Sequence, residues 1–525
     1  MVPATTQERF RLSPRLRDGL IILACVAAQA LYLLLTRYGY HRFGFPLDDA
    51  WIYQTYARNL AQSGQWAFIP GVPSTGSTSV LWTLILAPGH LLPLDPRWWT
   101  HFAGLLTLIA TALGAARLLE DEEDSLLVSL AVGLAVAVEW HLVWAAASGM
   151  ETGLFAALLV WFWVWLRRHD PVGTAHHWRN GLALGLWGGL LMLTRPEGVL
   201  ALGVAGLYGL FRPGRLTARL RWGLAAGLGF MLLLLPFFGL NVAVSGTPWP
   251  NTFYAKQTEY APLWARPYPL RLLDQAAISV VGAQVLLLPG LLFELWNRLR
   301  RRPPEWSALI PWVWGIAHWA LYAARLPVTY QHGRYAIPVV PLLVIYGVRG
   351  AARLARPHAP QRLIRLASLS WLLSAAALFP LMAGVLGAPA YARDVTFIED
   401  EMVATALWVT ENTPPDAVLA AHDIGALGYF APRPLLDLAG LVSPDVIPFM
   451  LDPARLAAYI VEGGADYLIV FPHWNDAYEA LVADPRFCPV WSTAERGVSS
   501  SLPPSGLGPM TVYEVRAANG CPSGY

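Results

Sequence analysis

Two neighbouring carboxylates, Asp48 and Asp49, follow the first long apolar run of the chain, which extends from Leu20 to Leu35. They are expected where the chain leaves a bilayer, and charge at a membrane boundary is costly to desolvate and often functional. Two aspartates could simply cap the helix predicted over 51–60, because acids favour a helix N-terminus. One carboxylate would suffice for a cap, so the pair favours acid–base chemistry.

Other charged residues stand between later apolar runs. Glu151 could be a second carboxylate facing Asp48, or an interfacial acid that ends a helix. Arg195 and Glu197 could pair with each other at a helix break or contact a substrate. Lys256 is the only lysine in the chain. It could bind a phosphate as a point charge or snorkel toward the membrane surface.

A polar cluster, Gln331–Tyr335, precedes the apolar run that begins at Tyr335. The forked guanidinium of Arg334 suits a phosphate, and His332 is a second candidate. The alternative is an interface anchor, with Tyr335 in the aromatic belt of the membrane. Arg58 lies on the helix predicted after the aspartates, at a spacing that can return it toward the same site.

The composition is that of a polytopic membrane protein. Apolar residues make up 55% of the chain, charged residues 14%, and the mean hydropathy is +0.43. Soluble domains carry about 25% charged residues. The net charge of +2 and the absence of a basic stripe in the sequence argue against a nucleic-acid partner. Cys488 and Cys521 could form a disulfide if the C-terminal end is extracytoplasmic.

The arginine-rich segments decide which apolar runs cross the membrane. If every run crossed, 212–221, 298–302 and 349–365 would face outward, against the positive-inside rule. They all face inward if 79–94, which contains Pro88 and Pro93, is interfacial or re-entrant. We therefore predict about eleven spans, with a cytoplasmic N-terminus and an extracytoplasmic C-terminus. The twelve apolar runs, including 79–94, are 20–36, 79–94, 99–118, 125–146, 152–166, 181–194, 198–211, 222–240, 276–296, 306–324, 335–348 and 366–388.

From about residue 390 the chain becomes more polar, and short apolar strands alternate with helical stretches. We predict an all-α polytopic membrane domain over 1–389 and an extracytoplasmic α/β domain over 390–525. The predicted strands are 418–422, 435–438, 467–471 and 510–515, and the predicted helices are 401–410 and 453–462.

An ordered set of short motifs resembles the GT-C type glycosyltransferases that use polyprenyl-phosphate sugars. The resemblance is greatest to the mycobacterial arabinofuranosyltransferases and to the protein mannosyltransferase and lipid A aminoarabinose transferase group. Each motif is weak alone, but together they extend from residue 48 to about 445. They are 48–50, 56–60, 70–71, 76–82, 148–152, 194–198, 250–256, 334–341, 423–429 and 437–441.

The resemblance implies a GT-C-like plasma-membrane enzyme that inverts the sugar's configuration. It would move a sugar from a polyprenyl-phosphate donor to a hydroxyl of a glycan, lipid or protein. The first aspartate of the pair, Asp48, would be the general base, with Asp49 and Glu151 as further catalytic carboxylates. These three carboxylates could also hold Mg or Mn. The implied substrate-binding residues are Arg58, Arg195, Glu197, Tyr254, Lys256, His332, Arg334 and Tyr335.

A membrane transporter or lipid flippase with an extracytoplasmic domain is the alternative function. Such proteins often contain repeated halves and charged residues in mid-span. The sequence has no evident paired halves, and the predicted topology gathers its unusual polar residues at one face. Both features favour the transferase.

Overall fold

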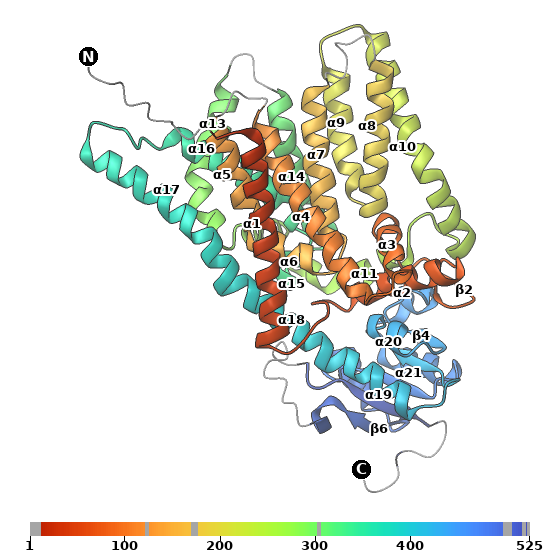
Figure 1. Ribbon diagram of the computed structural model, residues 1–525. Helices are drawn as coiled ribbons and strands as arrows, with labels where there is room; N and C mark the ends of the chain where they lie inside the picture. The colour runs from red at the N-terminus through yellow and green to blue at the C-terminus, as the bar shows by residue number, and fades with distance from the viewer. Residues whose placement is uncertain are drawn as a thin grey trace, which may run out of the picture.

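A helical bundle and a mixed β-sheet lie at opposite ends of the computed structural model (Figure 1). The structure describes residues 12–120, 125–169, 177–301, 306–496, 507–516 and 521. The bundle helices are α1 (Pro14–Leu34), α4 (Pro96–Glu120), α5 (Leu126–Ala137), α6 (Trp140–Ala147), α7 (Thr152–Arg168), α8 (His177–Thr194), α9 (Gly198–Phe211), α10 (Leu216–Ser245), α13 (Leu288–Arg300), α14 (Trp306–Arg325), α16 (Val340–Leu354) and α17 (Arg362–Met382).

The described residues contain five helices long and apolar enough to cross a membrane, or up to seven if each bent helix pair is one span. A span needs about 20 predominantly apolar residues. The predicted total of about eleven spans and the predicted orientation of the termini stay predictions. The five helices are Pro14–Gly39, Pro96–Leu119, Leu216–Ser245, Tyr330–Leu354 and Arg362–Asn412.

Two segments predicted as spans consist of bent helix pairs, so their crossing of the membrane stays a prediction. The segment 125–146 divides into α5 and α6, bent by 53°, and 276–296 falls on α12 (Tyr268–Ile278) and α13, bent by 97°. At the second break Gly282 has a φ of 124°, which residues with a Cβ rarely adopt. Val281 stands just before this glycine, and its carbonyl accepts a hydrogen bond from Nε1 of Trp140 at 2.8 Å. Trp140 is the first residue of α6, so this bond connects the two breaks.

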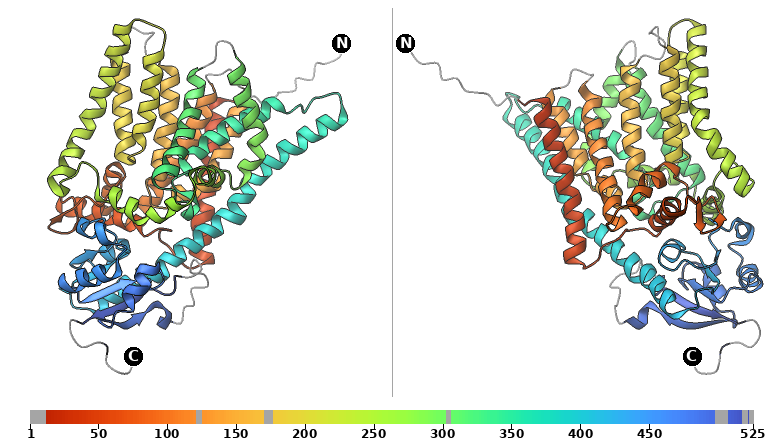
Figure 2. Two further views of the ribbon diagram at one scale, coloured as in Figure 1. Left: turned by 180° about the vertical axis from the view of Figure 1, so that it is seen from behind. Right: turned by 45° about the vertical axis from the view of Figure 1, so that its right-hand side comes forward.

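The segment 79–94, predicted not to span, forms the short helix α3 (Val80–Leu86) and one further turn ending at His90. This apolar stretch is too short to cross a bilayer and packs against α2 and α8. The preceding helix α2 (Asp49–Ser63) begins at the predicted carboxylate pair and is followed by the hairpin of β1 (Ala67–Ile69) and β2 (Val72–Pro73). Both helices, with α11 (Asn251–Glu259), lie between the bundle and the C-terminal sheet (Figures 1 and 2).

The C-terminal sheet has five strands in the order β4-β3-β5-β7-β6. Strand β3 is parallel to both of its neighbours, β4 and β5, whereas β7 is antiparallel to β5 and β6. Four strands match the prediction and β6 was missed. The elements are β3 (Leu419–Ala421), α20 (Gly425–Phe430), β4 (Leu435–Asp437), α21 (Pro453–Glu462), β5 (Tyr467–Val470), α22 (Asp476–Val482), β6 (Phe487–Ser492) and β7 (Thr511–Val515).

One helical path joins the bundle to the sheet. After α17 the chain continues through α18 (Ala388–Phe397) and α19 (Ala404–Asn412) without leaving a helical conformation. The path passes through the predicted domain boundary at 389/390, so this boundary stays a prediction. Beyond it, Cys488 and Cys521 form a disulfide, the pairing that the sequence left open.

Candidate active site

A cavity of about 400 Å³ lies where α2, α11 and α14 meet the turns at 148–152, 194–198 and 333–335. This volume is within the range of small-molecule sites, which runs from about 300 to 1,000 Å³. Seven of the predicted site residues line it: Asp49, Glu151, Arg195, Glu197, Lys256, Arg334 and Tyr335. Because they come from segments far apart in the sequence, the fold brings most of the predicted site together.

Two positively charged side chains, those of Lys256 and Arg334, contact Asp49 at one wall of the cavity. Its Oδ2 accepts from Lys256 Nζ at 3.1 Å and lies 2.7 Å from Arg334 Nη2. Burial disfavours the charged carboxylate, but Lys256 and Arg334 outweigh it and hold the pKa of Asp49 well below its usual range. Likewise, burial opposes the charge of Lys256, but Asp49 raises the pKa of this amine above its ordinary value. All three side chains are therefore charged near neutral pH.

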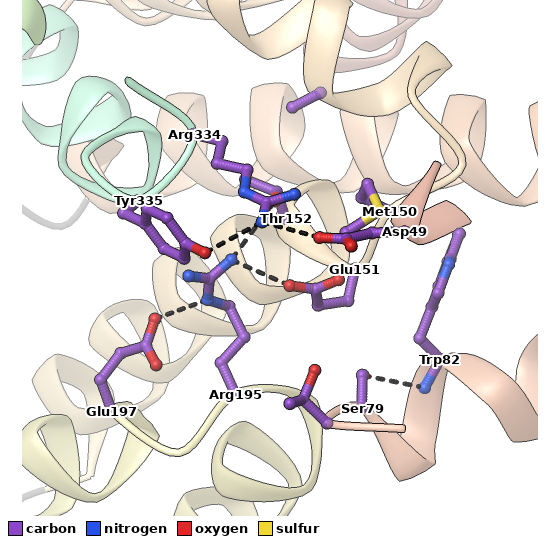
Figure 3. A network of polar contacts seen from close by, with 12 residues as sticks. Asp49, Ser79, Trp82, Met150, Glu151, Thr152, Arg195, Glu197, Arg334 and Tyr335 are labelled. Atoms are coloured by element: carbon purple, nitrogen blue, oxygen red, sulfur yellow. Dashed lines mark hydrogen bonds and ion pairs between the residues drawn. The ribbon is translucent and has the colours of Figure 1, made fainter. Parts of the chain in front are cut away.

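Arg195 organises a second charged network in the lining of the same cavity (Figure 3). Its Nη1 donates to Glu151 at 2.9 Å and its Nε donates to Glu197 at 2.5 Å. The hydroxyl of Tyr322 accepts from Arg195 Nη2 at 3.0 Å and donates to Glu197 at 2.6 Å. The side chains of Arg195, Glu151 and Glu197 are only 5–7% exposed. The predicted pairing of Arg195 with Glu197 is present, and Glu151 joins it.

Asp48 is next to Asp49 in the chain but is not part of the cavity lining. It is the N-cap residue of α2, but its side chain does not cap that helix. Its Oδ2 and Oδ1 instead accept from the backbone N–H groups of Gly425 and Ala426 at 2.7 and 2.8 Å, at the start of α20. Burial raises the pKa of Asp48 to about 7, and the charge of Asp423 adds to this effect, while the two N–H groups oppose it.

Three further predicted residues also lie outside the cavity lining. Arg58 donates to the carbonyls of Tyr429 and Gly428 at 2.6 and 3.1 Å. His332 Nε2 lies 2.7 Å from Asp394 Oδ2 and packs edge-on against Trp144. Tyr254 packs edge-on against Phe253, which does line the cavity.

The sequence analysis did not identify Tyr322 or the Gly425–Ala426 amides as part of the site. Tyr322 lies near the end of a predicted span, and a tyrosine there is ordinarily an interface anchor. Only its distance to Arg195 reveals its place in the network. Backbone amides leave no trace in a sequence, although the glycine at 425 could have indicated a close approach.

The three carboxylates considered for a divalent cation do not form a metal site. Asp48 is occupied by backbone amides, Asp49 by Lys256 and Arg334, and Glu151 by Arg195. In the part of the chain that the structure describes, no group of three or more His, Cys, Asp or Glu side chains could hold a metal ion. The donor set therefore does not fit the Mg or Mn suggested by the sequence.

Comparison with known proteins shows which solved structures have a similar fold. A family model described as a domain of unknown function (DUF8728) matches residues 389–512, and no curated protein matches the chain. ArnT from Cupriavidus metallidurans bound to undecaprenyl phosphate aligns over 94% of this chain and 98% of its own, with 16% identity and a TM-score of 0.58. The Archaeoglobus fulgidus oligosaccharyltransferase AglB, in complex with an inhibitory peptide and a dolichol-phosphate, aligns over 93% and 74%, with 12% identity and a TM-score of 0.60.

The arabinofuranosyltransferase AftD from Mycobacteria aligns over 97% of this chain, with 17% identity and a TM-score of 0.50. This chain spans only 42% of AftD. At these identities the likeness concerns the fold alone, and it includes both the helical bundle and the C-terminal region. The chain therefore has the fold of the GT-C glycosyltransferases, as the sequence motifs predict.

Proposed function

We propose that this protein is an inverting glycosyltransferase that moves a sugar from a polyprenyl-phosphate donor to a hydroxyl of a glycan, lipid or protein. The observation that carries the proposal is a cavity in which Lys256 and Arg334 contact Asp49, directly beside the neighbouring carboxylate Asp48. A general base works best with a pKa near the operating pH, and Asp48 meets that condition. Asp49, with a strongly lowered pKa, would be a weak base.

The cations at Asp49 suit the phosphate of the donor. Within the described part of the chain, Nε and Nη1 of Arg334 are buried and have no hydrogen-bond partner, so they can still donate to an anion. Lys256 adds a second positive charge beside them. Structural neighbours carry ligands of this chemistry, since ArnT binds undecaprenyl phosphate and AglB is in complex with a dolichol-phosphate.

The proposed reaction is a single displacement. Asp48 takes the proton of the acceptor hydroxyl, whose oxygen forms a bond to the anomeric carbon from the face opposite the phosphate. The bond between that carbon and the phosphate oxygen breaks, and the lipid phosphate leaves with the electron pair. Lys256 and Arg334 stabilise the charge that develops on it. Attack from the opposite face inverts the configuration of the sugar.

The same proposal places the site at the outer face of the plasma membrane. The positive-inside rule supports this orientation, because it turns the arginine-rich loops predicted from the sequence toward the cytoplasm. The Cys488–Cys521 disulfide supports it as well, because disulfides persist in oxidising compartments. In this orientation the C-terminal residues from about 390 form an extracytoplasmic α/β domain beside the acceptor.

The test is sugar transfer by purified protein from a panel of radiolabelled polyprenyl-phosphate sugars. Wild type is compared with Asp48→Asn and with Asp452→Asn as a matched control. Asp452 also accepts two backbone N–H groups, at 3.1 Å, but at the exposed start of α21. We expect transfer or donor hydrolysis from one sugar, lost in Asp48→Asn and retained in Asp452→Asn. Unchanged transfer by a folded Asp48→Asn protein would refute the base, and failure to bind any donor would favour a transporter.

A further inference from the structure

Side chains of helix α2 bind both ends of helix α20, which belongs to the C-terminal region. We call this pair of contacts the α2–α20 grip. The Asp48 carboxylate accepts from the first backbone N–H groups of α20, and the Arg58 guanidinium donates to the carbonyls of Gly428 and Tyr429 near its end. These are the backbone groups that a helix leaves without internal partners. The negative side chain meets the positive end of the peptide dipoles and the positive side chain meets the negative end.

Close packing between these two contacts fixes how α20 lies on α2. The Arg58 guanidinium carbon is 4.8 Å from the centre of the Tyr429 ring. The Trp51 ring lies 4.9 Å from that of Tyr429 and 4.7 Å from that of Phe430. A Cβ on Gly425 would overlap the backbone oxygen of Asp48, so only glycine permits this approach. A shift of α20 would therefore move the partners of the Asp48 carboxylate.

The grip also connects the sheet to the cavity. α20 lies in the connection between the parallel strands β3 and β4, so it moves with the sheet. The other member of the carboxylate pair, Asp49, is the first residue of α2 and lines the cavity. The contacts of Arg58 with the end of α20 can thus affect the position of the Asp48 carboxylate, although Arg58 does not line the cavity.

We propose that Arg58 is a positioning residue that acts through α20. By fixing α20 on α2, it keeps the Gly425 and Ala426 amides on the Asp48 carboxylate and so orients that carboxylate toward the acceptor hydroxyl. The inference rests on the proposed role of Asp48 as the base. It gives the C-terminal domain a part in the reaction that is separate from acceptor binding.

Loosening α20 should also change the acidity of Asp48. The groups that bear on its charge are Asp423 in the turn before α20, the amides of α20 itself, and Asp49 on α2. Burial is the largest of these influences and raises the pKa. Water that enters between α2 and α20 would therefore lower the pKa of Asp48 from about 7 toward the ordinary value of about 3.9.

The test compares wild type with Arg58→Met, Arg58→Lys and the control Arg433→Met. Arg433 also donates to two backbone carbonyls, those of Thr410 and Thr413 at 3.4 and 3.3 Å, but contacts α19 and the residue after it instead of α2. The first measurement is hydrogen exchange of the amides in 425–430. The second is kcat, donor KM and the pH profile of kcat/KM with the donor identified in the transfer assay.

For Arg58→Met we expect at least about tenfold faster exchange, a kcat lower by about tenfold or more with unchanged donor KM, and an acid limb about one pH unit lower or more. Arg58→Lys should recover part of each change, and Arg433→Met should show none. If the amides of 425–430 exchange in Arg58→Met at the wild-type rate, Arg58 does not hold α20 on α2 and the proposal is refuted. If they exchange faster but the acid limb of the kcat/KM profile does not move, the effect of Arg58 on Asp48 is refuted. Failure of the proposed function is distinct, because wild type itself would then transfer no sugar while the exchange results still stand.

Discussion

The two faces at the start of α2 differ in what surrounds their carboxylates. Asp49 is held by the charged groups of Lys256 and Arg334, whereas Asp48 is held by neutral backbone amides beside a second acid, Asp423. Successive residues of a helix point about 100° apart, so neighbours in the sequence can enter different environments. Environments that push the pKa values of two carboxyls apart commonly give them separate acid–base roles. We therefore expect the two carboxylates to have separate roles in the proposed reaction.

The sharpest way to break this comparison is to neutralise each carboxylate in turn. We expect Asp48→Asn to lower kcat by about 10²- to 10⁴-fold, the usual contribution of a general base, with little change in donor KM. Asp49→Asn removes the partner that orients Lys256 and Arg334, so it should raise donor KM more than it lowers kcat. Steady-state kinetics with the labelled donor separates the two patterns. An Asp49→Asn variant with the larger loss of kcat would exchange the two assignments.

Part of this division was predictable from the sequence and part was not. The helical spacing of apolar residues after Asp49 predicted α2, and isolated apolar strands bounded by turns predicted β3, β4, β5 and β7. β6 was missed because Pro489 interrupts it, and proline argues against an interior strand. The breaks within 125–146 and 276–296 were missed because hydropathy does not report a bend.

The candidate site shows the same limit. The predicted topology puts Glu151, Arg195, Lys256 and Arg334 at one face of the membrane, and all four do line one cavity, so their proximity could be predicted. The direction of Asp48 and Arg58 depends on α20, whose residues are more than 360 positions away along the chain. Such a contact is set by the docking of the sheet on the bundle, and local sequence carries no record of it.

The cavity wall around Arg195 gives the next largest expected effect. Arg195→Met would leave Glu151 and Glu197 buried without their cation, and breaking a buried ion pair costs about 3–5 kcal/mol of folding stability. Thermal unfolding in detergent measures it. The matched control is Arg266→Met, whose ion pair with Asp274 is exposed, with side chains 54% and 36% accessible. It should cost less than about 1 kcal/mol. Equal losses in the two variants would contradict a structural role for the Arg195 network.

The pH dependence of transfer tests the α20 face directly. Asp48 must be ionised to take a proton, so kcat/KM should fall about tenfold per pH unit below a pKa of about 7. Asp49 stays ionised over that range because its pKa is strongly lowered. The folded pKa of Asp48 lies above the unfolded value of about 3.9, so its contribution to stability is lost as pH rises from about 4 to 7. An acid limb centred near pH 4 would contradict the buried setting of Asp48.

The smallest effect is expected at His332, which separates backbone conformation from side-chain contact. His332 and Gln331 have φ values of 56° and 55°, and Arg334 follows two residues after His332. Asparagine tolerates this left-handed conformation, so His332→Asn loses a partly exposed hydrogen bond with Asp394 and the edge-on ring contact with Trp144 but keeps the backbone. We expect less than about a threefold change in donor kcat/KM, equivalent to under about 1 kcal/mol. His332→Val, whose branched side chain disfavours a positive φ, should displace Arg334 and weaken donor binding more. A loss above tenfold in His332→Asn would instead make the imidazole a direct substrate contact, as the sequence motif suggests.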